Sequence, residues 1–220
     1  MKTGFNSIKR IFILSIVSIF LLAATMSITA VAESDNMVII PYGDSEYRYM
    51  VVDQGEGTGF ELTDFDDSNF LTGDAGFGSI YSGCLLTSSD YVSTEWALNS
   101  DILVRKEFYL PAGASNLKVF VAIDNDVQVF VNGVDISGGL QVHEGCPSWN
   151  SFEFQADDDL LNAGTNLIAV RGRDRGVASF LDIKVTADTP HQEIPEFPTI
   201  ALPIAAIIGL AFFFQRKKDE

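Results

Sequence analysis

Residues 117–133 read LKVFVAIDNDVQVFVNG, and this stretch decides the fold class. On both sides of Asp124–Asp126, apolar side chains recur at every second position, which is the pattern of strands with one buried face. The closing Asn132-Gly133 pair suits a tight hairpin turn, because both residues accept positive φ angles at little cost. The stretch therefore predicts two half-buried strands followed by a hairpin turn.

Further strand candidates lie on both sides of this stretch. They are Glu46–Val52, Ile102–Leu110, Ser151–Gln155, Asn166–Arg171 and Ser179–Thr186. Gly-rich and Pro-rich turn signals separate these candidates, and no long helical period lies between them. The sequence therefore predicts an all-β domain, an antiparallel β-sandwich or jelly roll.

The charge of the chain is unevenly distributed. The formal net charge of the 220 residues is −16, but residues 33–195 contain 27 acidic residues against 8 Lys and Arg. Proteins that bind nucleic acid need basic patches, so this acidic segment excludes nucleic acid as an expected partner.

The N-terminus has the order of a secretory signal peptide. Lys9 and Arg10 precede the apolar run Ile11–Ala24, and the small residues Ala30 and Ala32 follow it. This order predicts a signal helix over residues 1–32, cut by signal peptidase after Ala32. An uncleaved transmembrane helix is the alternative, because residues 11–32 are long enough to span a bilayer.

The C-terminus contains a second apolar run. Residues 199–214 are uncharged and mostly apolar, and Arg216, Lys217 and Lys218 follow. The basic cluster is expected to stay in the cytoplasm, which places the acidic segment outside the cell. A transmembrane helix of this length reaches only about 24 Å, less than the roughly 30 Å of a hydrocarbon core. A tail that is later processed would tolerate this short length.

Pro195-Glu196-Phe197, the apolar run and the basic cluster occur in this order at the chain end. The order resembles the PEF-CTERM sorting signals of archaeal surface proteins. This resemblance implies that an archaeosortase, a membrane transpeptidase-like enzyme, cuts near Pro195, Glu196 and Phe197 and transfers the protein to a lipid anchor. A plain C-terminal membrane anchor is the alternative. Both place the domain at the cell surface, on the outer face of the cytoplasmic membrane.

Three motifs in the middle of the chain also occur in a recognisable order. They are LPAGA at 110–114, IDNDVQVFVNG at 123–133 and AGTNLIAV at 163–170. Together they resemble the galactose-binding-like jelly roll, which occurs in accessory modules of glycosidases and in many surface proteins. The expected organisation is a signal peptide (1–32), a β-sandwich ectodomain (33–188), a linker (189–194) and a PEF-CTERM signal with a transmembrane helix (195–220).

Cys84 and Cys146 are the only cysteines, and both lie in the exported segment. An even cysteine count in an oxidising compartment predicts one disulfide. Two alternatives stay open: a pair of reduced thiols, and a metal site that uses His143, Glu144 and Cys146.

Clusters of oxygen-bearing side chains are the candidates for a cofactor. Asp64, Asp66 and Asp67 lie near a predicted turn, where carboxylates could hold a structural calcium ion of the kind that many galactose-binding-like modules contain. Asp124–Asp126 offers similar ligands, whereas Asp157–Asp159 fits the start of a helical turn.

Arg171, Arg173 and Arg175 alternate at the end of a predicted strand. Because an arginine fork suits bidentate pairing, we expect them to pair with carboxylates such as Asp124 or Asp126. A site for an anionic ligand is the alternative.

Four aromatic residues could stack on sugar rings: Tyr81, Tyr91, Trp96 and Trp149. Trp149 is the best single ligand contact, because Pro147, Ser148 and Asn150 place it in a loop; a tryptophan in the core or at its rim is the alternative. The hydrolase and phosphate-binding motifs that we sought do not occur in the sequence. We therefore expect a membrane-tethered surface protein with a non-catalytic, glycan-binding module. A structural envelope protein is the first alternative, and a surface glycoside hydrolase is the second.

Overall fold

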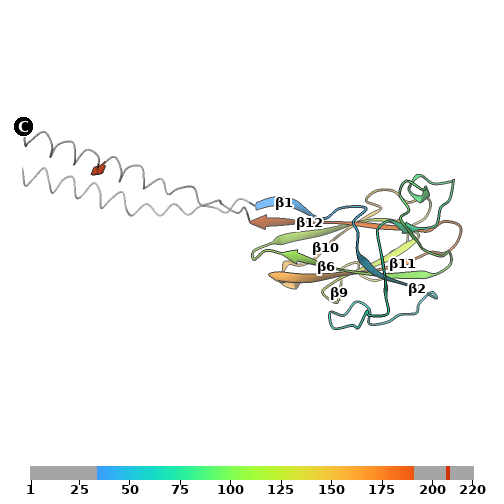
Figure 1. Cartoon of the computed structure of the whole chain (residues 1–220), viewed down its shortest axis with the longest axis horizontal. Coiled ribbons are helices and arrows are strands. Elements are labelled where there is room, and N and C mark those ends of the chain that lie inside the picture. Colours follow the sequence, from blue (N-terminus) through green and yellow to red (C-terminus); the bar gives the residue numbers. More distant parts are fainter. Residues whose placement is uncertain (1–33, 191–206, 209–220) are drawn as a thin grey trace, which may run out of the picture. The chain divides into compact units, whose positions relative to one another are not determined.

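The computed structural model describes residues 34–190 and 207–208. Residues 34–190 form two six-stranded sheets that lie as two layers (Figure 1). The only helical elements in this range are two short 3-10 turns, η1 (Leu85–Thr87) and η2 (Asp158–Leu160). The prediction of an all-β sandwich is confirmed.

The first sheet has the strand order β10-β7-β12-β4-β5, with β1 paired to β12. Its strands are β1 (Ser34–Ile40), β4 (Phe77–Gly78), β5 (Thr94–Glu95), β7 (Ser115–Asp124), β10 (Phe152–Gln155) and β12 (Phe180–Pro190). The short β4–β5 pair is parallel, and the other pairs of this sheet are antiparallel.

The second sheet has the strand order β3-β2-β6-β11-β8-β9, and all of its pairs are antiparallel. Its strands are β2 (Tyr47–Val52), β3 (Leu71–Gly73), β6 (Asp101–Leu110), β8 (Asp126–Val131), β9 (Val134–Asp135) and β11 (Gly164–Arg173). Every strand that the sequence predicts is therefore present in the two sheets.

The predicted hairpin turn joins β8 to β9. Asn132 and Gly133 have φ angles of 50° and 87°, the positive values that this turn requires. The Asn132 side chain also donates to Leu160 O at 2.7 Å and accepts a hydrogen bond from Leu167 N at 2.8 Å. The turn therefore fixes the hairpin and also ties it to β11 and to η2.

The core lies between the two layers. Along β12, alternate side chains from Leu181 to Ala187 point inward and are buried, as are alternate side chains of β7 from Leu117 to Ile123. Trp96 is fully buried in the same cluster, and its Nε1 donates to Ser100 Oγ at 3.1 Å. Trp96 is thus a core residue, and the idea that it stacks on sugar is wrong.

The outer face of the first sheet is covered as well. Phe180 and Ala122 point away from the core, yet both are buried because Leu86 packs on them from the segment between β4 and β5. A second, smaller apolar layer therefore forms over this part of the sheet. Asp182 of β12 is buried as well and accepts a hydrogen bond from Gly43 N at 2.9 Å.

The two ends of the described domain lie beside each other. Ser34 is opposite Pro190 in the β1–β12 pair (Figure 1). Phe180, at the other end of β12, is opposite Asp124, and ten residues of extended strand separate Phe180 from Pro190 by about 33 Å. β12 includes Thr189 and Pro190, so the linker boundary predicted at residue 189 is too early by two residues.

Several predicted features lie outside the described residues. These are the signal peptide with Ala30 and Ala32, the motif Pro195, Glu196 and Phe197, and most of the C-terminal apolar run. Within the described part of the chain, no helix has both the length and the hydropathy needed to cross a membrane.

Candidate functional site

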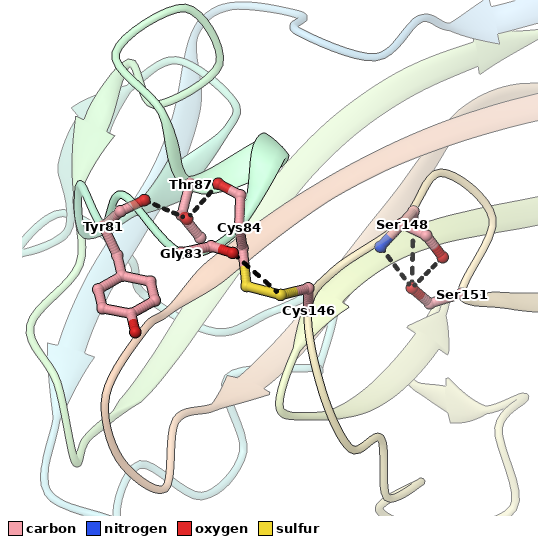
Figure 2. Close-up of a disulfide and its surroundings, with 7 residues drawn as sticks. All are labelled: Tyr81, Gly83, Cys84, Thr87, Cys146, Ser148 and Ser151. Carbon is pink, nitrogen blue, oxygen red and sulfur yellow. Dashed lines mark hydrogen bonds between the residues drawn. A yellow bond between two sulfur atoms is a disulfide. The ribbon is translucent and has the colours of Figure 1, made fainter.

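A disulfide joins two loops over the outer face of the first sheet. Cys84 lies in the loop of residues 79–93, and Cys146 lies in the loop of residues 142–151; their Cα atoms are 5.4 Å apart (Figure 2). The predicted disulfide is confirmed. Because Cys146 is oxidised, the alternative of a metal site built on His143, Glu144 and a Cys146 thiolate is wrong.

Polar contacts fix the shape of each loop close to the disulfide. Thr87 Oγ1 is fully buried and lies 2.9 Å from the carbonyl oxygens of both Tyr81 and Cys84 (Figure 2). In the other loop, Ser151 Oγ donates to Ser148 O at 2.9 Å. The two loops are therefore ordered internally as well as joined to each other.

The loops bring three aromatic side chains together. The Trp149 ring centroid lies 4.5 Å from that of Tyr42 and 5.6 Å from that of Tyr91. Trp149 and Tyr91 are exposed, with 41% and 37% of their surface accessible. Tyr42, Tyr91 and Trp149 form what we call the aromatic cluster.

Tyr42 is the fixed member of the aromatic cluster. Its Oη donates to Asn150 Oδ1 at 2.8 Å and accepts from Asn150 N at 3.2 Å, which ties Tyr42 to the residue next to Trp149. The Lys184 ammonium lies 5.4 Å from the Tyr42 ring centroid. Burial raises the pKa of Tyr42 to about 12, so the phenol stays protonated and can donate this hydrogen bond.

A pocket of about 400 Å³ lies beside the disulfide, near the start of β12. It is lined by Tyr81, Gly83, Cys84, Asp124, Asn125, Glu144, Gly145, Cys146, Arg175, Gly176, Val177 and Ala178. Arg175 is the only cationic side chain among these lining residues, and it donates to Asp126 at 3.0 Å and to Glu144 at 2.7 Å. We call this space the disulfide pocket.

The other two arginines of the alternating series have a structural role. Arg171 and Arg173 both bind the fully buried Asp101, at 2.7 and 2.8 Å. The prediction that the arginines pair internally is confirmed. However, among residues 34–190 Asp126 forms an ion pair with Arg175 alone, and Asp124 forms none. The sequence does not predict the role of Asp101, because only the β6–β11 register places it opposite Arg173.

The structure does not bring the predicted calcium ligands together. Asp64 and Asp66 are exposed, whereas Asp67 is paired with Arg105 at 2.9 Å and with Arg48 at 3.8 Å. Among residues 34–190, no three His, Cys, Asp or Glu side chains are grouped so that they could hold a metal ion. Because guanidinium groups already neutralise Asp67, this donor set does not fit calcium. Asp157–Asp159 starts the short turn η2, as predicted.

Comparison with known proteins identifies the C-terminal segment. Residues 194–218 match the PEF-CTERM archaeal protein sorting domain. This domain implies an exported, membrane-associated surface protein that is processed by an archaeosortase. The expectation drawn from Pro195-Glu196-Phe197 and the basic cluster is confirmed.

The sequence has no significant match among curated proteins. Among solved structures, a glycosyl hydrolase family 2 member from Bacteroides cellulosilyticus is 19% identical with a TM-score of 0.45, over 66% of this chain and 20% of that chain. A Bacteroides uniformis beta-glucuronidase is 18% identical with a TM-score of 0.44, over 70% and 18%. A Lactobacillus rhamnosus beta-glucuronidase is 14% identical with a TM-score of 0.43, over 72% and 29%. The chain thus spans between about a fifth and three tenths of the length of these proteins.

Proposed function

We propose that this protein is a surface-tethered, non-catalytic module that binds glycans through its aromatic cluster. The observation that carries the proposal is the position of Trp149, which is exposed and flanked by two tyrosines. A disulfide joins the loop that carries Trp149 to the loop that carries Tyr91, whereas Tyr42 lies between β1 and β2. Sugar rings bind to aromatic faces because their C–H groups pack on the ring while their hydroxyl groups reach polar atoms at its edge.

Two polar side chains, those of Lys184 and Asn150, lie next to residues of the aromatic cluster. The Lys184 ammonium lies over the Tyr42 ring and also 4.4 Å from the Phe120 ring centroid. Asn150 is exposed next to Trp149. A bound sugar could therefore meet an indole face together with donors at its edge.

The loops are also ordered before any ligand binds. Preformed loops lose less conformational entropy on binding than mobile loops do, which raises affinity without any new contact. The disulfide and the Thr87 hydrogen bonds supply this order.

The proposed attachment follows from the sorting domain and from the chain ends. A cleaved signal peptide (1–32) would export the domain, and cutting near Pro195, Glu196 and Phe197 would transfer it to a lipid anchor. Only three residues separate Pro190 from the matched segment, so the β1–β12 end is the end of the domain next to the proposed attachment in the sequence. If the tail is not cut, residues 199–214 are the proposed transmembrane helix.

The intact mass of the protein extracted from membranes tests this attachment. A mass that lacks residues 1–32 and the basic cluster Arg216-Lys217-Lys218 is expected. Retention of the basic cluster would show that the tail serves as a membrane anchor and is not processed.

A hydrolase would need two facing carboxyl groups that act as acid and base. The disulfide pocket contains Asp124 and Glu144, but Glu144 is already paired with Arg175 at 2.7 Å. We therefore propose binding without catalysis. Release of nitrophenol from a panel of nitrophenyl glycosides by the wild-type protein, lost in Asp124→Asn, would overturn this part of the proposal.

A glycan array probed with the full chain tests the binding function. Wild type should bind a defined subset of glycans, and Trp149→Ala should lose at least tenfold in affinity, or about 1.4 kcal/mol. Tyr109→Ala is the matched control, because Tyr109 is an aromatic residue on β6 with 70% of its surface exposed, and β6 belongs to the second sheet whereas the loops follow or precede strands of the first. If no glycan binds and the protein instead forms ordered assemblies in native membranes, the alternative of a structural envelope protein replaces this proposal.

A further inference from the structure

The disulfide pocket contains a buried carboxylate to which no described residue donates a hydrogen bond. Five aspartates of the domain are buried: Asp101, Asp124, Asp126, Asp174 and Asp182. Four of them accept hydrogen bonds from arginine side chains or from backbone N–H groups. Asp124 has only 5% of its surface exposed, and within residues 34–190 no group donates a hydrogen bond to its carboxylate, which lines the pocket. One oxygen of Asp174 is also buried without a hydrogen bond from these residues, but Asp174 does not line the pocket.

An unpaired carboxylate in such a position is costly. Burial of a charged group without hydrogen-bond partners costs several kcal/mol, so native proteins supply a partner for nearly all of them. Asp124 lines the disulfide pocket, so a ligand in the pocket can supply the missing donor.

The charges around Asp124 determine whether a cationic or an anionic ligand is favoured. Burial raises the pKa of Asp124 to about 6, and Asp174, Glu144 and Asp126 add to the rise. Arg175 opposes the rise, but its guanidinium already binds Asp126 and Glu144. Carboxylates therefore outnumber cations at this position, which disfavours an anionic ligand and favours a cationic one.

The arrangement of the ligands favours an organic cation over a metal ion. Calcium needs six to eight oxygen ligands on one site, and the described residues include no group of three acidic, His or Cys side chains that could hold an ion. An ammonium group instead offers three hydrogen-bond donors and can be satisfied by one or two carboxylates. The pocket volume of about 400 Å³ lies in the range of small-molecule sites, and Tyr81 and Val177 offer apolar surface to a carbon frame.

We propose that the disulfide pocket binds a small organic ammonium ion, such as an amino sugar, through the Asp124 carboxylate. The proposal goes beyond the glycan site at the aromatic cluster and does not depend on it. The ammonium group fills the unpaired position at Asp124, and the rest of the ligand lies against Tyr81.

Isothermal titration of the full chain at pH 7.5 tests this assignment. Glucosamine should bind at least tenfold more tightly than glucose or N-acetylglucosamine, which have nearly the same ring but no ammonium group. A titration with ethanolamine shows whether the pocket requires an amino sugar or accepts a simple amine. Binding equal to that of glucosamine would support the ammonium site and assign a simple amine to it.

Variants then locate the site. Asp124→Asn should weaken glucosamine at least tenfold, whereas Asp90→Asn, which removes the same charge from an exposed position of the 79–93 loop, should leave it unchanged. Trp149→Ala should leave it unchanged as well, so failure of this proposal can be told apart from failure of the glycan site. Equal affinity for glucosamine, glucose and N-acetylglucosamine, the absence of binding by either amine, or displacement of glucosamine by millimolar calcium would overturn the proposal. The comparison of ligands on wild type decides the outcome even if Asp124→Asn does not fold.

Discussion

Cys84 and Cys146 are 62 residues apart in the sequence, and the bond between them places the loop that carries Tyr91 beside the loop that carries Trp149. Neither loop belongs to a strand of the sandwich. Both cysteines line the disulfide pocket, and the bond joins the loops that carry Tyr91 and Trp149, so the disulfide supports the candidate sites as well as the fold.

Removal of the disulfide should therefore affect both stability and the loops. In the chain-entropy account, a cross-link that closes a loop of this length contributes about 4 kcal/mol to the free energy of unfolding. We expect Cys84→Ser with Cys146→Ser to lose a large part of this amount in a urea titration, and to increase iodide quenching of Trp149. A double variant as stable as wild type would contradict the proposal that the disulfide stabilises the domain and its loops.

Asp101 should be the most sensitive charged residue of the domain. It is fully buried and binds Arg171, Arg173 and the Gly55 N–H, so Asp101→Asn leaves two guanidinium groups without their counter-charge. Loss of one partner from a buried ion pair costs about 3–5 kcal/mol. Glu153→Gln is the control, because it breaks the partly exposed pair with Lys118 and should cost less than about 1 kcal/mol.

The same residue should contribute to unfolding in acid. Burial raises the pKa of Asp101, but hydrogen bonds from Arg173, Gly55 and Arg171 together outweigh burial and lower the pKa below its ordinary 3.8. A carboxyl group whose pKa is lower in the folded state stabilises the fold above pH 3.8, and this contribution is lost as the pH falls through the folded-state pKa. Unfolding free energies measured between pH 5 and pH 2 should fall steeply in wild type and less steeply in Asp101→Asn.

Asp182 should produce the opposite pH dependence. Its burial raises its pKa from 3.8 to about 7, despite hydrogen bonds from the Gly43 and Ile183 N–H groups. Between pH 4 and pH 7 the folded protein then holds a proton that the unfolded chain releases, so the contribution of Asp182 to stability decreases as the pH rises and levels off above pH 7. The total change is on the order of 4 kcal/mol.

The melting temperature of Asp182→Asn, compared with that of wild type from pH 4 to pH 8, measures this contribution. The variant should lose the decline that wild type shows as the pH rises, while Asp159→Asn, an exposed control, should keep it. Parallel curves for wild type and Asp182→Asn would show that Asp182 does not titrate in this range.

The sequence predicts the main strands because each of them has one buried face. Apolar residues recur at every second position in β7 and β8, so these strands can be predicted without knowledge of the strands that they pair with. β1 was missed, because residues 34–38 are exposed on both faces and become a strand only through pairing with β12. β4 and β5 contain two residues each, which is too short for any period to be visible.

The candidate site is predictable only in part, for a similar reason. The neighbours Pro147, Ser148 and Asn150 predict that Trp149 lies in a loop. Its partner Tyr42 is 107 residues away, and no local sequence pattern connects the two residues. Asp124 occupies an outward-facing position of the alternating pattern of β7, which predicts that its side chain is exposed and pairs with an arginine. The 79–93 loop instead covers that face, and a covering loop leaves no periodic signal in the strand beneath it.

Tryptophan emission tests whether Trp149 is the sugar platform, because the chain has only two tryptophans and Trp96 is fully buried. The full chain is titrated with the glycan that binds most tightly on the array, and emission and iodide quenching are recorded for wild type and for Tyr109→Ala. If Trp149 is the sugar platform, emission changes in a saturable way in both proteins, and bound glycan protects the exposed indole from iodide. Saturable glycan binding that leaves Trp149 emission and its quenching unchanged would contradict the account.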